Sequence, residues 1–187
     1  MVDPRISRTA RALEAAVVTL ARERPASRIS VSELADRAGV SRATVYNRYG
    51  TPLDVLVDVL GRDLAAARHE DEARRMTGDT QGDEALRLAT QDIADHVLRF
   101  ADIYRRALHD PADQGVYAAL ADHFAAYSLP FIERSVPSPV PESSHMIVAQ
   151  FLSHGFVGAI KQWLLDETIT RDALVEAVNA CAPAWWS

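Results

Sequence analysis

The stretch that decides the fold is SVSELADRAGVSRATVYNRY, which runs from Ser30 to Tyr49. Ser30 and Glu33 have the spacing of a capping box, in which each side chain pairs with a backbone N–H that the first helical turn leaves open. Gly39 can adopt the positive φ that ends a helix without steric cost, and Ser41 is a favoured N-cap for a second helix. These residues predict a helix-turn-helix whose second helix carries side chains suited to a DNA groove.

The chain around this motif resembles the tetracycline-repressor (TetR) family. From Ile29 to Tyr46 it follows, nearly residue for residue, the family pattern hydrophobic–Ser/Thr–Val–x–x–Ile/Leu–Ala–x–x–Ala–Gly–Val–Ser–x–x–Thr–hydrophobic–Tyr, and the likeness extends over residues 8–56. Two positions depart from the pattern. Arg48-Tyr49 stands where the family commonly has His-Phe, which preserves positive charge, and Pro52 replaces a common Lys, which removes one expected phosphate contact.

Helical periodicity continues along the rest of the chain, without a convincing alternating strand pattern. Besides the two helices of the motif, we expect helices over residues of about 5–24, 51–75, 83–99, 102–109, 113–134, 142–167 and 171–181, with Asp102, Asp113 and Thr170 as caps. The predicted fold class is therefore all-α, with about nine helices. The resemblance divides them into an N-terminal three-helix DNA-binding domain over residues 1–50 and a C-terminal helical ligand-binding and dimerisation domain over residues 51–187.

Charge is distributed unevenly along the 187 residues. Residues 1–50 hold nine arginines and five acidic residues, a net charge of +4, whereas the whole chain carries −6 and the remainder therefore −10. A basic N-terminal quarter on an acidic remainder is expected of a small DNA-binding head joined to a body that faces other partners.

Composition and missing motifs exclude several classes of protein. The single cysteine, Cys181, cannot form an internal disulfide, so a reducing compartment is expected. Glu14 and Thr19 interrupt the first apolar run, and no stretch of about 18 apolar residues could span a membrane, so we expect a cytoplasmic protein. No metal-ligand spacing, nucleophile elbow, phosphate loop or dinucleotide fingerprint is present, so neither an enzyme nor a cofactor or metal is predicted.

The TetR resemblance assigns base-edge contacts to Arg42, Ala43 and Asn47. Near the N-terminus of a helix in the major groove, the Arg42 fork can reach O6 and N7 of a guanine, and Ala43 can touch a thymine methyl group. The expected phosphate-contacting residues are Ser30, Ser41, Thr44, Tyr46 and Arg48. The alternatives are structural: both serines could act only as helix caps, Tyr46 could be partly core, and the arginines could form a solvated face.

Apolar stripes in the C-terminal part are interrupted by histidine or tyrosine, which suits an apolar cavity with a few oriented polar groups. The candidate ligand contacts are His96, Phe100, Tyr104, His123, Phe124, Tyr127 and Trp163. A small apolar or aromatic effector is the expected ligand. For each single residue, a satisfied core histidine or ordinary aromatic packing is an equally good interpretation.

Residues 142–167 are apolar on nearly every side, which is unusual for a helix with one buried face. The candidate dimer contacts on this helix and the next are Phe151, His154, Gly155, Gly158, Gln162, Leu165, Leu174 and Val178. Because one subunit can cover only one of the two faces, we expect a homodimer joined by a two-fold helical bundle, as the resemblance also implies. The alternative is that the second face packs on helices of its own chain.

Two functional hypotheses follow. The first is a ligand-responsive transcriptional regulator, usually a repressor, in which a homodimer binds palindromic double-stranded operator DNA and an effector changes the separation of the two recognition helices. Repression and activation are both compatible with these features. The second is a helical small-molecule carrier with a non-functional DNA-binding head. The net charge of +4 in residues 1–50 favours the regulator.

Overall fold

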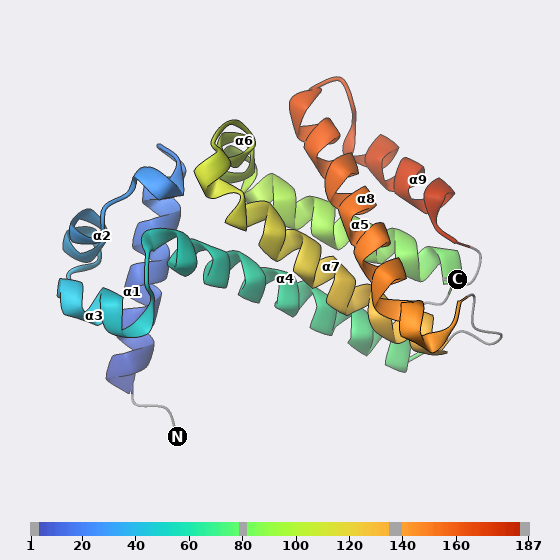
Figure 1. Ribbon diagram of the computed structural model, residues 1–187, viewed down its shortest axis with the longest axis horizontal. Helices are drawn as coiled ribbons and strands as arrows, with labels where there is room; N and C mark the ends of the chain where they lie inside the picture. Colours follow the sequence, from blue (N-terminus) through green and yellow to red (C-terminus); the bar gives the residue numbers. More distant parts are fainter. Residues whose placement is uncertain (1–3, 79–81, 135–139, 184–187) are drawn as a thin grey trace. The chain divides into compact units, whose positions relative to one another are not determined.

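The structure, a computed structural model, describes residues 4–78, 82–134 and 140–183, and their regular secondary structure is entirely helical (Figure 1). The described residues form nine α-helices: α1 (Pro4–Ala21), α2 (Val31–Ala38), α3 (Arg42–Arg48), α4 (Pro52–Met76), α5 (Gly82–Arg99), α6 (Ala101–His109), α7 (Gly115–Arg134), α8 (His145–Leu165) and α9 (Arg171–Cys181). Three single 3-10 turns lie in the connections, η1 (Ala26–Arg28), η2 (Pro111–Asp113) and η3 (Glu142–Ser144). The prediction of an all-α fold is confirmed.

The helices belong to two compact units, neither of which is continuous in sequence. The first contains Met1–Leu60 and Asp102–Tyr117, and the second contains Gly61–Ala101 and Ala118–Ser187. Helices α4 and α7 therefore each contribute residues to both units. The functional division at residue 50 stays a prediction. In the structure, the segment 102–117 belongs to the same compact unit as the N-terminal helices.

In the first unit, α2 packs against both α1 and α3. The fully buried side chains of this core include Leu13, Val17, Leu34 and Val45. Ser30 caps α2 by accepting the N–H of Glu33, and Gly39 takes a φ of +66°, which a residue with a side chain would adopt only at a cost. The cap, the buried stripe and the glycine produce the tight turn before α3, so the predicted helix-turn-helix is present (Figure 1).

Residues from the segment 102–117 hold the connection between α1 and α2. The Asp113 carboxylate, only 2 % exposed, accepts the N–H groups of Ala26 and Ser27, both at 2.7 Å. Arg106 on α6 donates to the carbonyl oxygen of Arg22 at 3.0 Å. Arg106 of α6 therefore bonds a backbone carbonyl group just after α1, and Asp113 of η2 bonds the backbone N–H groups at the start of η1.

Four predicted helices begin or end elsewhere in the structure. Asp102 is not the cap predicted for the helix over residues 102–109, because α6 begins at Ala101 and Asp102 lies in its first turn. Asp113 does not cap the helix predicted over residues 113–134, because its carboxylate is used by η1, and α7 begins at Gly115. The first helix ends at Ala21, three residues early, since the chain turns toward η1. The helix predicted over residues 142–167 is also shorter, because Glu142–Ser144 form η3 and the backbone leaves the helix at Asp166. Thr170, in contrast, caps α9 as predicted by accepting the N–H of Ala173 at 3.1 Å.

The second unit consists of the later part of α4 with α5, α8, α9 and most of α7, and α9 packs against both α5 and α8. Its fully buried side chains include Leu64, Val97, Leu120, Ile132 and Ile160. Asp63 of α4 contacts His96 and Arg99 of α5, both at 2.6 Å. Arg171 at the start of α9 makes a bidentate pair with Asp95 of α5, with both bonds at 2.7 Å. The ion pairs of Asp63 with Arg99 and of Asp95 with Arg171, and the hydrogen bond between Asp63 and His96, fix α5 against α4 and α9.

Candidate functional site

Helix α3 is short and is anchored by one side chain. Val45 is fully buried, and its neighbours along the helix are half-buried or exposed. Ser41 caps the helix by accepting the N–H of Thr44 at 3.2 Å, and the two hydroxyl oxygens lie 2.8 Å apart. The anchor and the cap together leave the outer face of α3 exposed to a partner.

The eight predicted DNA contacts gather on α3 and at the start of α2. Thr44 is half-buried, and the seven others are exposed, namely Ser30, Ser41, Arg42, Ala43, Tyr46, Asn47 and Arg48. Tyr46 is 61 % exposed, which excludes the alternative that its ring belongs to the core. Ser30 and Ser41 do act as helix caps, and their contact with DNA stays a prediction.

A hydrogen-bonded chain holds Arg48 in place. Arg48 Nε donates to the hydroxyl of Tyr49 at 3.2 Å, and that hydroxyl donates to the Asp58 carboxylate on α4 at 2.9 Å. Burial raises the pKa of Tyr49 above its ordinary value, so the hydroxyl keeps its proton. Sequence reasoning missed Asp58 because it lies nine residues after Tyr49, on the next helix, and a contact between two helices has no periodic signal in the sequence.

The second unit contains a cavity of about 480 Å³ between α5, α7, α8 and α9. Small-molecule sites commonly measure about 300–1,000 Å³. Most of the lining is apolar, with Leu86, Ile93, Phe124, Phe156, Ala159 and Val178 among the wall residues. The cavity is therefore large enough for a small apolar ligand.

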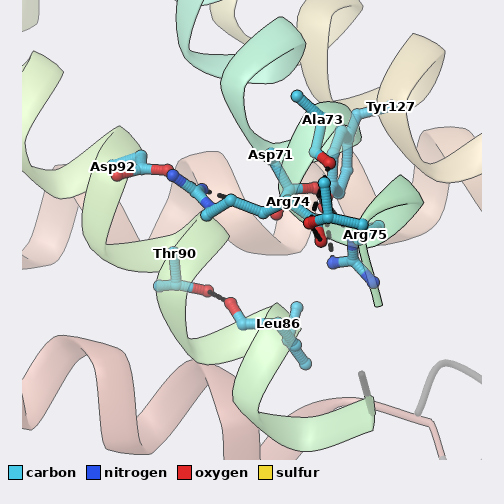
Figure 2. Close-up of polar contacts among 9 residues, drawn as sticks. Asp71, Ala73, Arg74, Arg75, Leu86, Thr90, Asp92 and Tyr127 are labelled. Atoms are coloured by element: carbon cyan, nitrogen blue, oxygen red, sulfur yellow. Dashed lines mark hydrogen bonds and ion pairs between the residues drawn. The ribbon is translucent and has the colours of Figure 1, made fainter. Parts of the chain in front are cut away.

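Three of the described wall residues carry hydroxyl groups, and each hydroxyl is already engaged within the protein. Thr90 donates to the carbonyl oxygen of Leu86, one turn earlier in α5, at 2.9 Å. Ser128 donates in the same way to the carbonyl oxygen of Phe124 in α7, at 2.7 Å. The Tyr127 hydroxyl donates to Asp71 at 2.7 Å and accepts from Arg75 at 2.9 Å (Figure 2). The wall therefore offers no hydroxyl donor to a ligand without breaking a bond, and it favours apolar groups.

Behind Tyr127 lies a cluster of charged residues from α4 and α5 (Figure 2). Asp71 is 2 % exposed and accepts from Arg75 Nε at 2.8 Å. Arg74 pairs with Asp92 of α5, and the hydrogen bond to Asp92 raises the pKa of the Arg74 guanidinium. Sequence reasoning missed this cluster, because α4 is amphipathic only in its first half and its later charges looked like a solvated surface.

Two of the seven predicted ligand contacts, Phe124 and Tyr127, line the cavity. The five others lie outside its walls, namely His96, Phe100, Tyr104, His123 and Trp163. Trp163 donates to the carbonyl oxygen of Ile169 at 3.0 Å, and Tyr104 belongs to the first unit. For these five, the structure favours the alternative of packed interior side chains.

The two candidate histidines, His96 and His123, are neutral at neutral pH. His96 is fully buried, and burial lowers its pKa even though Asp63 opposes the shift. Burial lowers the pKa of His123 to about 4, and the charges of Arg68 and His96 act in the same direction. His96 therefore behaves as a core side chain, and His123 as a half-buried neutral one.

One face of α8 is uncovered within the chain. The exposed predicted dimer contacts are Phe151, His154, Gly155, Gly158, Gln162 and Leu165, with Phe151 77 % and Leu165 57 % exposed. Within the described residues nothing covers this face, which argues against the alternative that it packs on its own chain. Val178 is half-buried. Leu174, which the sequence predicts to contact the partner subunit, is only 4 % exposed, because α9 packs it into the interior of its own unit.

Two family profiles match the regions just described. A profile described as "Bacterial regulatory proteins, tetR family" matches residues 12–52, which contain the helix-turn-helix. A TetR C-terminal profile described as "Transcriptional regulator C-terminal region" matches residues 84–179, just over half of the chain. The chain belongs to the TetR family. It is a DNA-binding transcriptional regulator and not an enzyme.

Solved structures of other TetR-fold proteins resemble this regulator over nearly its whole length. One is the crystal structure of Thermus thermophilus FadR, a TetR family transcriptional repressor, in complex with lauroyl-CoA. Its sequence is 23 % identical to this one, the match covers 91 % of this chain and 90 % of the FadR chain, and the TM-score is 0.65. The fatty acid degradation regulator FadR from Bacillus halodurans is 16 % identical, covers 96 % and 95 % of the two chains, and has a TM-score of 0.62. At these identities the likeness shows the fold. No curated protein sequence matches the chain.

Membership of the family decides between the two functional hypotheses. The DNA-binding profile covers residues 12–52, so the TetR-family regulator is retained and the carrier with a non-functional head is set aside. Among the described helices, none has the length and apolarity needed to cross a membrane.

Proposed function

We propose that this TetR-family regulator is a ligand-responsive repressor, which binds a palindromic operator as a homodimer and releases it when an apolar effector fills the cavity. The observation that carries the proposal is that one chain combines an exposed, arginine-bearing α3 with an apolar cavity of about 480 Å³. A cytoplasmic location belongs to the same proposal, because the operator is there.

The DNA-binding part of the proposal rests on exposure and charge. Arg42 and Arg48 lie at the two ends of α3, and both are exposed. Residues 1–50, which include α3, carry a net charge of +4. An arginine near the start of a recognition helix suits a guanine edge, and one at its end suits a phosphate.

The homodimer rests on the uncovered face of α8. Gly155 and Gly158 have no side chain, and a Cβ built at either position meets no atom within 4 Å. A second copy of α8 could therefore approach closely there, with Phe151 and Leu165 buried at the two ends of the contact. Two recognition helices roughly 34–36 Å apart would then enter successive major grooves.

The effector class rests on the cavity walls and on one structural neighbour. Thermus thermophilus FadR was crystallised with lauroyl-CoA. The apolar walls between α5, α7, α8 and α9 suit a hydrocarbon chain of the same kind. We therefore propose a long-chain acyl group as the part of the effector that enters the cavity, and ligand binding shifts the population toward a conformer that does not fit the operator.

The proposal is tested by adding lauroyl-CoA to the regulator bound to an operator duplex selected from random DNA, with fluorescence anisotropy as the readout. We expect operator affinity to fall at least about tenfold, a typical allosteric coupling. Ala159→Phe fills part of the cavity and should bind DNA normally but ignore the acyl compound.

The matched control is Ala126→Phe, the same change at an exposed alanine of α7 outside the cavity. This control should respond like the unmodified protein. The proposal is contradicted if acyl-CoAs of eight to sixteen carbons all leave the complex intact, or if Ala159→Phe responds as strongly as its control.

A further inference from the structure

We infer that the effector is an anionic amphiphile: its hydrocarbon tail occupies the cavity, and its carboxylate or phosphate head is bound by Arg75 and Arg134 beside Phe131. This inference rests on the proposed function, because it concerns the same effector cavity. It adds a head-group site at the last turn of α7, next to the cavity wall formed by Tyr127.

The cavity itself excludes the head group. The hydroxyls of Thr90, Tyr127 and Ser128 already donate to protein oxygens at 2.7–2.9 Å. The Cys181 thiol, which also lines the cavity, is a weak donor. An anion buried among these groups would lose its water without gaining charge-assisted hydrogen bonds, which is strongly unfavourable. The tail therefore enters and the anion stays outside.

The face of α7 that lines the cavity continues to Phe131 and Arg134. Tyr127 forms part of the wall, Phe131 follows one turn later, and Arg134 follows Phe131 by three residues, so all three share one side of the helix. The rings of Tyr127 and Phe131 are 5.2 Å apart, measured between centroids. A ligand tail that extends past the Tyr127 ring would therefore meet Phe131 one helical turn further along α7.

Two guanidinium groups lie over the ring of Phe131. The central carbon of Arg75 is 4.8 Å and that of Arg134 is 5.4 Å from the ring centroid. Arg134 donates to the carbonyl oxygen of Pro130 at 3.0 Å, and no carboxylate of the described residues forms an ion pair with it. Two like charges on one ring repel, so an anion that contacts both is favoured.

Arg75 also keeps donors for a ligand. Within the described part of the chain its Nε donates to Asp71 and one Nη to Tyr127, whereas a guanidinium carries five N–H groups. In the cluster of Figure 2, Asp71 and Asp92 are matched by Arg74 and Arg75. Arg134, which lies over the ring of Phe131, adds a further positive charge beside this cluster. A carboxylate and a phosphate both fit such forked donors.

The test compares three probes with the same twelve-carbon tail, dodecanoate, dodecyl phosphate and dodecan-1-ol, by isothermal titration into the full-length protein at pH 7.5 and low salt. We expect each anion to bind at least about tenfold more tightly than the alcohol, since bonds to charged groups are the stronger ones. Whichever anion binds more tightly identifies the head as a carboxylate or a phosphate.

The variant Arg134→Gln removes one exposed guanidinium, and its loss leaves no buried carboxylate unpaired. The affinity of the anions should fall about five- to tenfold, and that of the alcohol should not change. Arg87→Gln is the matched control, because Arg87 is an exposed arginine of the same unit that pairs with Glu84 and lies outside the cluster. Arg75→Lys, which keeps the charge opposite Asp71, should weaken the anions selectively as well.

Equal affinity of all three probes overturns the head-group site while leaving the proposed effector cavity intact. The site is also overturned if Arg134→Gln weakens the alcohol as much as the anions, or if Arg87→Gln acts like Arg134→Gln. Absence of binding by every probe overturns both the inference and the proposed acyl-binding cavity, so the two failures are distinguishable.

Discussion

At the scale of single residues, the two ends of α3 have different chemistry. Arg42 stands at the first position of the helix, after the Ser41 cap, and is exposed. Arg48 stands at the last position and is held by Tyr49, which is bonded to Asp58 of α4. An arginine at the N-terminus of the recognition helix suits base edges, whereas one at its C-terminal end suits the phosphate backbone.

This difference predicts separate effects of two substitutions on DNA binding. Arg42→Ala should lower the ratio of operator to scrambled-DNA affinity, by about 1–3 kcal/mol if it contacts one guanine. Arg48→Ala should weaken all DNA about equally and reduce the slope of log affinity against log salt by about one. Fluorescence anisotropy across a salt series measures both quantities. Equal, undiminished binding by both variants would defeat the assignment.

His123 makes stability depend on pH. Its pKa is about 4 in the folded chain and about 6.5 when exposed in the unfolded chain, so the unfolded state binds the extra proton between these values. The stabilisation is complete above about pH 6.5 and is lost as the pH falls toward 4. The full shift corresponds to roughly 3 kcal/mol.

The measurement is urea unfolding of the wild type and His123→Gln between pH 7.5 and 4. The variant should lose markedly less stability over this range than the wild type does. The control is His69→Gln, since His69 is an exposed histidine of α4. The account of His123 is wrong if both variants retain the pH dependence of the wild type.

At the scale of elements, the connection between α1 and α2 depends on the segment 102–117. Asp113 accepts two N–H groups of η1 at 2.7 Å, and Arg106 donates to the end of α1. The helix-turn-helix is therefore positioned by residues distant in sequence as well as by its own caps. This segment joins α5 to α7, both of which line the cavity.

Asp113→Ala should destabilise the first unit because it leaves two backbone N–H groups without their charged acceptor. We expect a loss of roughly 3 kcal/mol in the free energy of unfolding, measured by urea denaturation. The matched control is Asp102→Ala, an exposed acid on the same segment, which should change stability by about 0.5 kcal/mol or less. A loss no larger than that of the control contradicts the capping role.

The sequence predicts elements that depend on local chemistry. The caps Ser30, Ser41 and Thr170 and the turn at Gly39 are all confirmed, because each acts within one helical turn. Contacts between distant segments, such as Asp113 with η1, have no local signature. The predicted ligand contacts also find the α7 wall of the cavity, through Phe124 and Tyr127, but not the contribution of Cys181 at the end of α9.

At the scale of the whole molecule, two features relate ligand binding to DNA binding. Helices α4 and α7 contribute residues to both units. The cavity wall also includes Phe151, Gly155 and Val178, all predicted dimer contacts. An effector could therefore bias the dimer as well as the single chain.

The dimer is tested by placing a bulky charge in the uncovered face of α8. Gly158→Arg should leave the fold intact, since a Cβ there meets no atom within 4 Å and arginine favours helix more than glycine does. It should convert the dimer to a monomer in size-exclusion chromatography with light scattering. Ala126→Arg, at an exposed alanine of α7, should stay dimeric. A dimeric Gly158→Arg protein contradicts the proposed interface.

The most direct measurement is selection of bound duplexes from random DNA by the full-length protein, followed by sequencing. The account predicts an inverted repeat whose half-site centres are about one helical turn apart, with a conserved guanine in each half-site that Arg42→Ala no longer selects. Enrichment of a single, unpaired half-site, or of no sequence at all, would contradict a two-fold dimer that reads DNA through α3.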